Sequence, residues 1–168
     1  MGLHSMKRWS FTRIIMPLGL LFFLVAFANT PETWILGSTR VQFKGTAVEG
    51  YFEGVKGKLQ FNEAQLSASS FDLYLEVASI STGNELKDEH ARGTKWFNAS
   101  KYPHIRFTSS SFEKVGKGYI VEGSMQIKGV KRIMRIPFSL QETDKGIQLQ
   151  SIFSVNRSDF NIEGNAMS

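Results

Sequence analysis

Residues 79–107 read SISTGNELKDEHARGTKWFNASKYPHIRF, and they separate two stretches in which apolar and polar residues alternate. Residues 71–77, just before them, and residues 105–108, at their C-terminal end, have the period of a half-buried strand. Pro103 stands just before the second stretch, and it fits the first residue of a strand because it lacks a donor N–H. The segment therefore predicts a long crossover between two strands.

The crossover carries the signals of one short helix within residues 84–93. Asn84 can cap its N-terminus, Asp88 and Glu89 suit its early turns, and Gly93 can end it. The aromatic pair Trp96-Phe97 follows the helix. We expect this pair to pin the crossover onto one end of a barrel.

Alternation elsewhere in the chain predicts several more strands. Residues 49–61 are expected to form a strand pair that bends at Gly54 and Gly57, since glycine inside a strand usually marks a bulge or a sharp bend. Eight or so strands with turn signals between them, and no long helical period after residue 28, favour an all-β sandwich or barrel. The expected strands cover residues 34–44, 49–61, 71–80, 105–112, 117–128, 133–142 and 147–155.

Residues 1–28 have the pattern of an export signal. Lys7, Arg8 and Arg13 precede an apolar run of fifteen residues, 14–28, which ends in the small-x-small sequence Ala26-Phe27-Ala28. As a helix, fifteen residues reach about 22 Å, which is short of the roughly 30 Å hydrocarbon core of a bilayer. We expect a signal peptide (1–28), a tether (29–33) and one domain (34–168), exported to the periplasm or secreted. An uncleaved N-terminal anchor is the alternative.

Composition narrows the function classes. The chain has 168 residues, 42% of them apolar, and no Cys, which excludes disulfides, thiol nucleophiles and Cys-ligated metals. Three of the twenty basic residues lie before Asn29 and no acidic residue does, so 17 basic and 15 acidic groups remain after it, about +2. This balance predicts a mixed solvated surface and no nucleic-acid partner.

Four blocks of the sequence carry a family resemblance: SISTGN (79–84), KDEH (87–90), WFNASKYPHIRFTS (96–109) and VEGSMQIKGVKR (121–132). Together they resemble the YceI-like family of secreted bacterial proteins, over residues 34–162. The resemblance implies a lipocalin-like closed antiparallel barrel, and an elongated apolar pocket for a polyisoprenoid lipid.

One departure from the family pattern concerns the C-terminus. Family members usually continue past the Arg-x-Asp-Phe block, here residues 157–160, into a last strand, whereas this sequence stops at Ser168. A missing closing strand would leave an open edge. The barrel would then be incomplete, close with fewer strands, or pair with another chain, for example as a homodimer through this edge.

The alternation places a large apolar set on the interior. A small barrel can fill with its own side chains or hold one ligand. The pattern alone favours a packed core, and the resemblance favours ligand binding. The expected lining comprises Phe43, Phe61, Phe71, Leu73, Leu75, Val77, Phe107, Val121, Met125, Ile127, Met134, Ile136, Phe138, Leu149 and Phe153. Lys128, Lys131, Arg132 and Arg157 are candidates for a polar head group, or are solvated turn charges.

Catalytic chemistry finds little support. His90 and His104 are the only histidines after residue 28, and the adjacent side chains of Asp88, Glu89 and His90 would point in different directions on a helix or a strand. No G-x-S-x-G elbow and no phosphate-binding loop is present. We expect no catalytic residues, no metal and no cofactor. The two functions to compare are an exported lipid-binding barrel and a solid barrel that acts as a structural or protein-interaction module.

Overall fold

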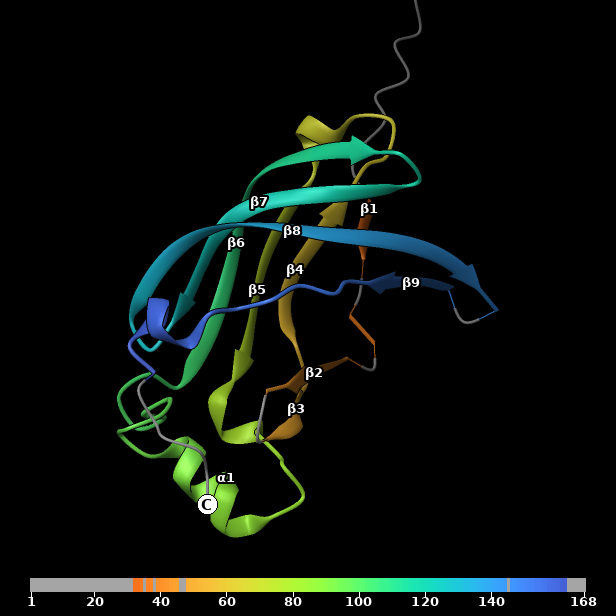
Figure 1. Ribbon diagram of the computed structural model, residues 1–168. Coiled ribbons are helices and arrows are strands. Elements are labelled where there is room, and N and C mark those ends of the chain that lie inside the picture. Colours follow the sequence, from red (N-terminus) through yellow and green to blue (C-terminus); the bar gives the residue numbers. More distant parts are fainter. Residues whose placement is uncertain (1–31, 35, 38, 46–47, 145, 163–168) are drawn as a thin grey trace, which may run out of the picture.

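The computed structural model describes residues 32–34, 36–37, 39–45, 48–144 and 146–162, and most of this part is β-structure (Figure 1). Seven strands form one antiparallel sheet in the order β1-β4-β5-β6-β7-β8-β9, and β2 and β3 form a separate hairpin. The strands are β1 (Glu32–Trp34), β2 (Arg40–Lys44), β3 (Glu49–Glu53), β4 (Lys56–Phe61), β5 (Ser70–Glu76), β6 (His104–Val115), β7 (Gly118–Ile127), β8 (Val130–Thr143) and β9 (Gly146–Gln150). The helices are α1 (Glu85–Arg92) and the 3-10 turns η1 (Leu66–Ala68), η2 (Val77–Ser79) and η3 (Arg157–Phe160).

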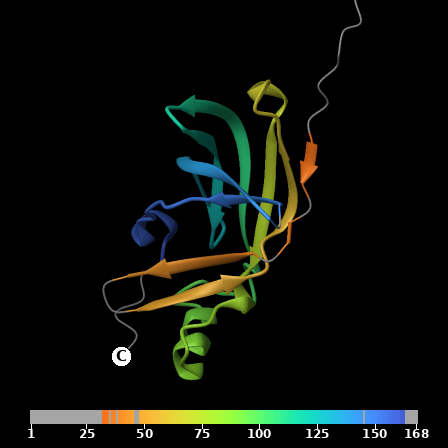
Figure 2. The ribbon, with the colours of Figure 1, turned by 90° about the vertical axis from the view of Figure 1, so that its right-hand side faces the viewer.

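The large sheet curls into a half-barrel, as the view in Figure 2 shows. Strands β1 and β9 lie at the two ends of the strand order, and no ladder between described residues joins them. The all-β antiparallel architecture with one crossover helix is confirmed. The expected closed barrel is not, because the described strands stop short of a ring of pairings.

Gly54, between β3 and β4, and Gly57, at the start of β4, bend the chain as the sequence predicted. Gly54 has φ +73° and Gly57 has φ +124°, which only glycine adopts at low cost. A Cβ at Gly57 would also lie 2.0 Å from the carbonyl oxygen of Asp72 on β5. The sheet therefore depends on glycine at this position for both space and backbone conformation.

Alternation along β7 defines the interior. Its residues are buried at every second position from Tyr119 to Ile127 and partly exposed between them. Gly123 is the one member of this inward row without a side chain. A Cβ there would lie 2.6 Å from Cζ of Phe107, so the absence of a side chain makes room for that ring.

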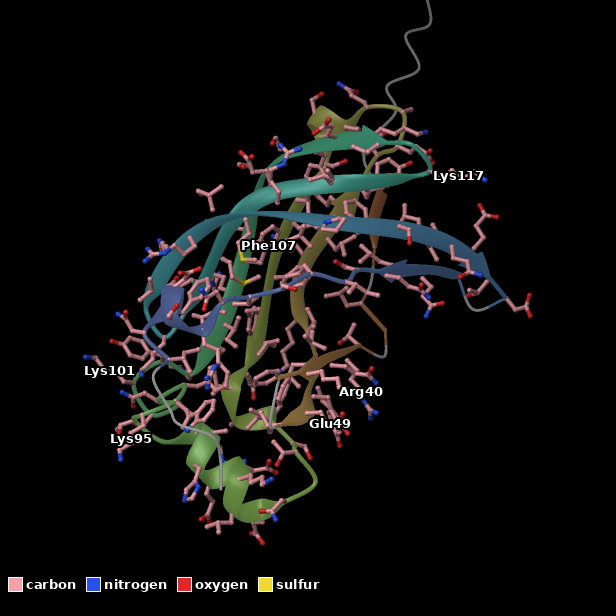
Figure 3. All side chains as sticks on the ribbon, in the orientation of Figure 1. Arg40, Glu49, Lys95, Lys101, Phe107 and Lys117 are labelled. Atoms are coloured by element: carbon pink, nitrogen blue, oxygen red, sulfur yellow. The ribbon has the colours of Figure 1, made fainter. Side chains whose placement is uncertain are left out.

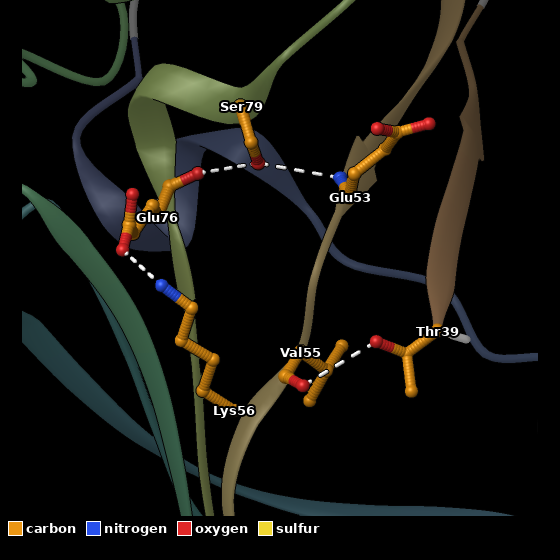
Figure 4. A network of polar contacts seen from close by, with 6 residues as sticks. All are labelled: Thr39, Glu53, Val55, Lys56, Glu76 and Ser79. Atoms are coloured by element: carbon orange, nitrogen blue, oxygen red, sulfur yellow. Dashed lines mark hydrogen bonds and ion pairs between the residues drawn. The ribbon is translucent and has the colours of Figure 1, made fainter. Parts of the chain in front are cut away.

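The hairpin of β2 and β3 is fastened across one end of the sheet (Figure 4). The Ser79 hydroxyl accepts a hydrogen bond from the Glu53 amide (3.2 Å) and donates one to the Glu76 carbonyl (2.7 Å). Residues Tyr51 and Ser81 form an isolated antiparallel bridge beside it. These bonds connect the hairpin to the chain just after β5.

The crossover contains the expected helix. The side chain of Asn84 accepts a hydrogen bond from the Lys87 amide at 3.0 Å, and α1 ends at Gly93. After it, Trp96 is buried and the ring of Phe97 packs edge-on against Phe52 of β3, with 5.7 Å between centroids. The pinning role expected of the aromatic pair is confirmed. No helix in the described part of the chain is long and apolar enough to span a membrane.

Three strand predictions are wrong in extent. The expected strand 71–80 ends at Glu76, after which η2 begins. The expected strand 34–44 is two strands, β1 and β2, which pair with β4 and β3 and are separated around Gly37. The expected strand 147–155 ends at Gln150. The predicted signal peptide and most of the tether lie outside the described residues.

Candidate ligand-binding site

Fourteen of the fifteen predicted lining residues are buried or half-buried, and all of these except Val77, which lies on η2, belong to one apolar core. Ten are buried: Phe61, Phe71, Leu75, Val77, Phe107, Val121, Met125, Ile127, Ile136 and Phe138. Four are half-buried and pack against this core: Phe43, Leu73, Met134 and Leu149. Phe153 was expected inside, but it is 38% exposed because the chain has left the sheet before it.

One end of the interior is filled by aromatic rings. Phe61 of β4 contacts four other rings, those of Phe71, Phe112, Tyr119 and Phe138, with centroid distances from 4.9 to 6.4 Å. Most of these pairs are edge-to-face, the arrangement that aromatic quadrupoles favour. Side chains alone occupy this end, so a long guest could lie only toward the other end.

The middle of the interior is lined by more adaptable side chains. Phe107 of β6 pairs in register with Met125 of β7, and Gly123 pairs with Met134 of β8. Methionine side chains adapt to irregular shapes because they are unbranched and polarizable. This part of the interior is the one suited to a flexible apolar chain.

The interior is open beside β8, where residues 151–156, hereafter the strap, run from β9 to η3 (Figure 1). Continuing the β8–β9 register, in which Ser139 pairs with Gln150, would place Pro137 opposite Ile152. Proline has no N–H to donate to that pair. The Pro137 carbonyl accepts instead from the Ser151 hydroxyl at 2.6 Å, and Ile152 is 92% exposed. Regular pairing therefore ends at Gln150.

A pocket of about 310 Å³ lies where β8 and the strap have separated. Apolar and polar groups share its wall. Its lining residues are Arg132, Ile133, Met134, Arg135, Ser154, Val155, Asn156, Asp159 and Phe160. Met134 connects it to the inward-facing row, and Phe160 is buried beneath it.

The four candidate head-group residues lie on the β7–β8 turn and its first β8 residues, and on η3. Lys128 has a structural task, because its ammonium donates to the carbonyls of Asn161 (2.7 Å) and Lys95 (3.4 Å). Arg157 lies over the ring of Trp96, 5.0 Å from its centroid. Arg132 lines the pocket, and Lys131 beside it is exposed. Of the four, Arg132 is best placed for a ligand.

An ionic cluster marks the aromatic end on its outside. The Lys114 ammonium donates to the Glu63 carboxylate at 2.9 Å. A hydrogen bond from Tyr119, followed by the bond and charge of Lys114, lowers the pKa of Glu63. Burial, followed by the hydrogen bond to Glu63, raises the pKa of Tyr119 above its ordinary value.

The polar crossover residues serve the backbone of the crossover. Asp88 accepts from both the amide and the hydroxyl of Thr82 at 2.7 Å, so it fixes the segment before α1. His90 is exposed on α1, whereas His104 packs edge-on against Tyr74 on β5. Within the described ranges, no three His, Cys, Asp or Glu side chains gather as a metal site would require.

Sequence reasoning missed the pocket residues of the strap and η3, namely Ser154, Val155, Asn156, Asp159 and Phe160, and also Ile133 and Arg135 on β8. The signal that could have found them is Pro137, a proline inside an alternating strand, which indicates a missing ladder bond. Phe112 and Tyr119 were also absent from the expected lining. They belong to the aromatic end.

Comparison with known proteins agrees with this geometry. A family model for the YceI-like domain matches residues 35–168. The chain belongs to the YceI-like family. The resemblance seen in the sequence is thereby confirmed, over most of the described barrel.

Two curated relatives and two solved structures illustrate the similarity of this YceI-like chain. UPF0312 proteins of Photorhabdus laumondii and Yersinia enterocolitica are 31% and 28% identical over 94 and 119 residues, which cover 55% and 67% of this chain. These alignments cover 49% and 62% of the relatives, so the chain spans about half the length of the curated relatives it matches. Burkholderia cenocepacia BcnA superimposes with a TM-score of 0.67 at 25% identity, over 75% of this chain and 80% of BcnA. A Campylobacter jejuni YceI protein superimposes at 0.53 and 20% identity, over 92% and 84%.

Proposed function

We propose that this YceI-like protein is exported and binds one elongated apolar molecule, such as a polyisoprenoid, on the concave side of its sheet. It sequesters or carries the molecule and performs no covalent step on it. Each buried CH₂ group contributes about 0.8 kcal/mol, so a long prenyl chain can be held without specific polar contacts. The observation that supports this most is the apolar row that leads from Met125 and Phe107 past Met134 to an open pocket.

The polar groups of the pocket complete the proposal. Arg132 would meet the polar end of the guest, and Phe160 and Val155 would border its first apolar segment. The aromatic end limits how far the guest extends, because the rings around Phe61 already occupy that space. The ligand is therefore amphiphilic and enters with its apolar end first.

Binding of a polyprenyl alcohol, measured at equilibrium with the purified chain, tests this function. Met134→Trp places a bulky ring in the route and should weaken binding at least tenfold. Ser139→Trp on the same strand is the control. Ser139 is exposed, pairs with Gln150 of β9 and does not line the pocket. Equal binding by both variants, or no binding by the parent chain, would contradict the proposal.

An interaction module remains the second candidate, because ring packing makes one end of the interior solid and β9 ends the strand order of the described sheet. In this case a second copy would pair along β9. Sedimentation at several concentrations tests it: a dimer that Ile147→Lys dissociates supports pairing, and a monomer at every concentration excludes it. Cell fractionation tests export, which requires the protein outside the cytoplasm.

A further inference from the structure

Cations gather where the crossover, the β7–β8 turn and η3 meet. Contacts of Lys128 with Lys95 and Asn161, and the approach of Gly129 to the ring of Tyr102, bring these three segments together. Figure 3 shows Lys95 and Lys101 projecting on one side of the molecule and Lys117 at its opposite end. We call this surface the basic end; its exposed cations are Lys95, Lys101, Lys131, Arg132 and Arg157.

Unpaired cations cluster at the basic end, although single unpaired lysines such as Lys58 and Lys117 also occur elsewhere on the described surface. Arg40, Lys56, Arg106, Lys114 and Arg135 each lie within 4 Å of a carboxylate. Among the residues that the structure describes, Lys95, Lys101, Lys131 and Arg132 form no such pair. Outside helix α1, Asp159 is the one acidic residue on the described part of the three segments.

Helix α1 adds little to this balance. Its acidic residues Glu85, Asp88 and Glu89 are opposed by Lys87 and Arg92 on the same helix, and Asp88 bonds to Thr82. The basic end therefore keeps an uncompensated positive charge while the domain as a whole is nearly neutral. A partner with dense negative charge would be attracted to this surface.

Two further features favour a lipid surface over a nucleic acid. Ile133 is 69% exposed beside Arg132, and an apolar side chain among cations suits the interface of a bilayer. The aromatic rings of this end are not available for base stacking, because Trp96 is buried under Arg157 and Tyr102 lies against the turn at Gly129. The pocket between β8 and the strap also opens beside Arg132.

We propose that the basic end docks the protein on an anionic phospholipid bilayer and so faces the pocket toward the membrane. This inference goes beyond the proposed function, and it can fail while the proposed function still holds. Each Lys or Arg near an anionic surface strengthens binding roughly fivefold. Neutralising two of them should therefore weaken membrane association about 25-fold.

Co-sedimentation of the full chain with vesicles tests the docking surface. The vesicles are phosphatidylcholine alone, or phosphatidylcholine with one third phosphatidylglycerol. Lys95→Gln/Lys131→Gln is compared with Lys58→Gln/Lys117→Gln, whose lysines are also exposed and unpaired among the described residues but lie on β4 and the β6–β7 turn. Both pairs keep residues 1–31 unchanged, so any contribution of that segment cancels.

The expected result is a loss of roughly 25-fold for the first pair on anionic vesicles, less than threefold for the second, and no difference on neutral vesicles. Added salt should reduce the binding of the parent chain. Equal losses for both pairs would overturn the inference. So would tighter binding to duplex DNA than to anionic vesicles. Unchanged binding of polyprenyl alcohol by Lys95→Gln/Lys131→Gln would show that the proposed function survives either result.

Discussion

The Ser151 hydroxyl donates a hydrogen bond to the carbonyl oxygen of Pro137 at 2.6 Å, at the position where β9 has just stopped pairing with β8. The Ser151 side chain thus takes the place of a backbone donor to the Pro137 carbonyl. The second ladder bond is absent because proline has no N–H. The strap beyond it follows β8 without a ladder, and the pocket lies between them. Pro137 therefore explains why the β8–β9 pairing ends and the pocket is open.

Pro137→Val should extend the β8–β9 ladder by returning an N–H to the edge of β8. One added backbone bond is worth about 1 kcal/mol, so amide exchange in the strap should slow roughly fivefold. Ser151→Ala should have the opposite effect, since it removes the existing bond. Hydrogen exchange read residue by residue measures both, and strap amides that respond to neither substitution would show that Pro137 does not control the opening.

Phe61→Ala should destabilise the fold by about 3–5 kcal/mol, because it removes a ring that contacts four others at the aromatic end. Phe153→Ala is the matched control. Its ring is 38% exposed, so the loss should stay below about 1 kcal/mol. Denaturant unfolding compares the two, and similar losses would mean that the end of the barrel is loosely packed.

Gly123→Ala should cost about 1–3 kcal/mol through overpacking. The new methyl would lie 2.5 Å from the Thr108 carbonyl oxygen and 2.6 Å from Cζ of Phe107. Gly37→Ala should be close to neutral, since no atom of the residues that the structure describes lies within 4 Å of a Cβ there. Thermal unfolding of both variants checks the close approach of β6 and β7, and a neutral Gly123→Ala would refute it.

Tyr119 should ionise above pH 10 in an alkaline titration, because burial raises its pKa above the ordinary 10.0. Because the pKa of Tyr119 is raised in the folded state, its contribution to the free energy of unfolding is fully present below the pKa of the unfolded state. That contribution is lost as pH rises through the pKa of the folded state. Glu63→Gln should reduce the shift by removing the carboxylate, and leave the effect of burial. The difference in tyrosinate absorbance between the parent chain and Tyr119→Phe measures both, and a Tyr119 pKa at or below the ordinary 10.0 would contradict the structure.

Alternation predicted most of the fold. The inward rows of β4, β7 and β8, the bends at Gly54 and Gly57, and the Asn84-capped helix follow from local signals, and the structure confirms them. The strap could not be predicted this way. Residues 147–155 alternate as a strand does, but their pairing depends on a proline ten or more residues earlier on the neighbouring strand. The alternation pattern describes one strand, and it does not show whether the neighbouring strand has the backbone N–H groups needed to pair with it.

For the candidate site too, positions along a strand could be predicted, whereas contacts between strands could not. Inward positions could be read from the sequence, but whether rings fill them depends on which inward residues meet across the sheet. Phe61 meets Tyr119 and Phe138 through strands that are distant in sequence. Lys128 looked like a head-group ligand from its charge, whereas its contacts with two carbonyls show a structural task.

Native mass spectrometry of the freshly purified chain, followed by solvent extraction, tests the central claim most directly. The account predicts a stoichiometric long-chain lipid on the parent chain and on Ser139→Trp, and its loss from Met134→Trp. Repeated preparations that carry no lipid, and that take up no polyprenyl alcohol when it is offered, would contradict it.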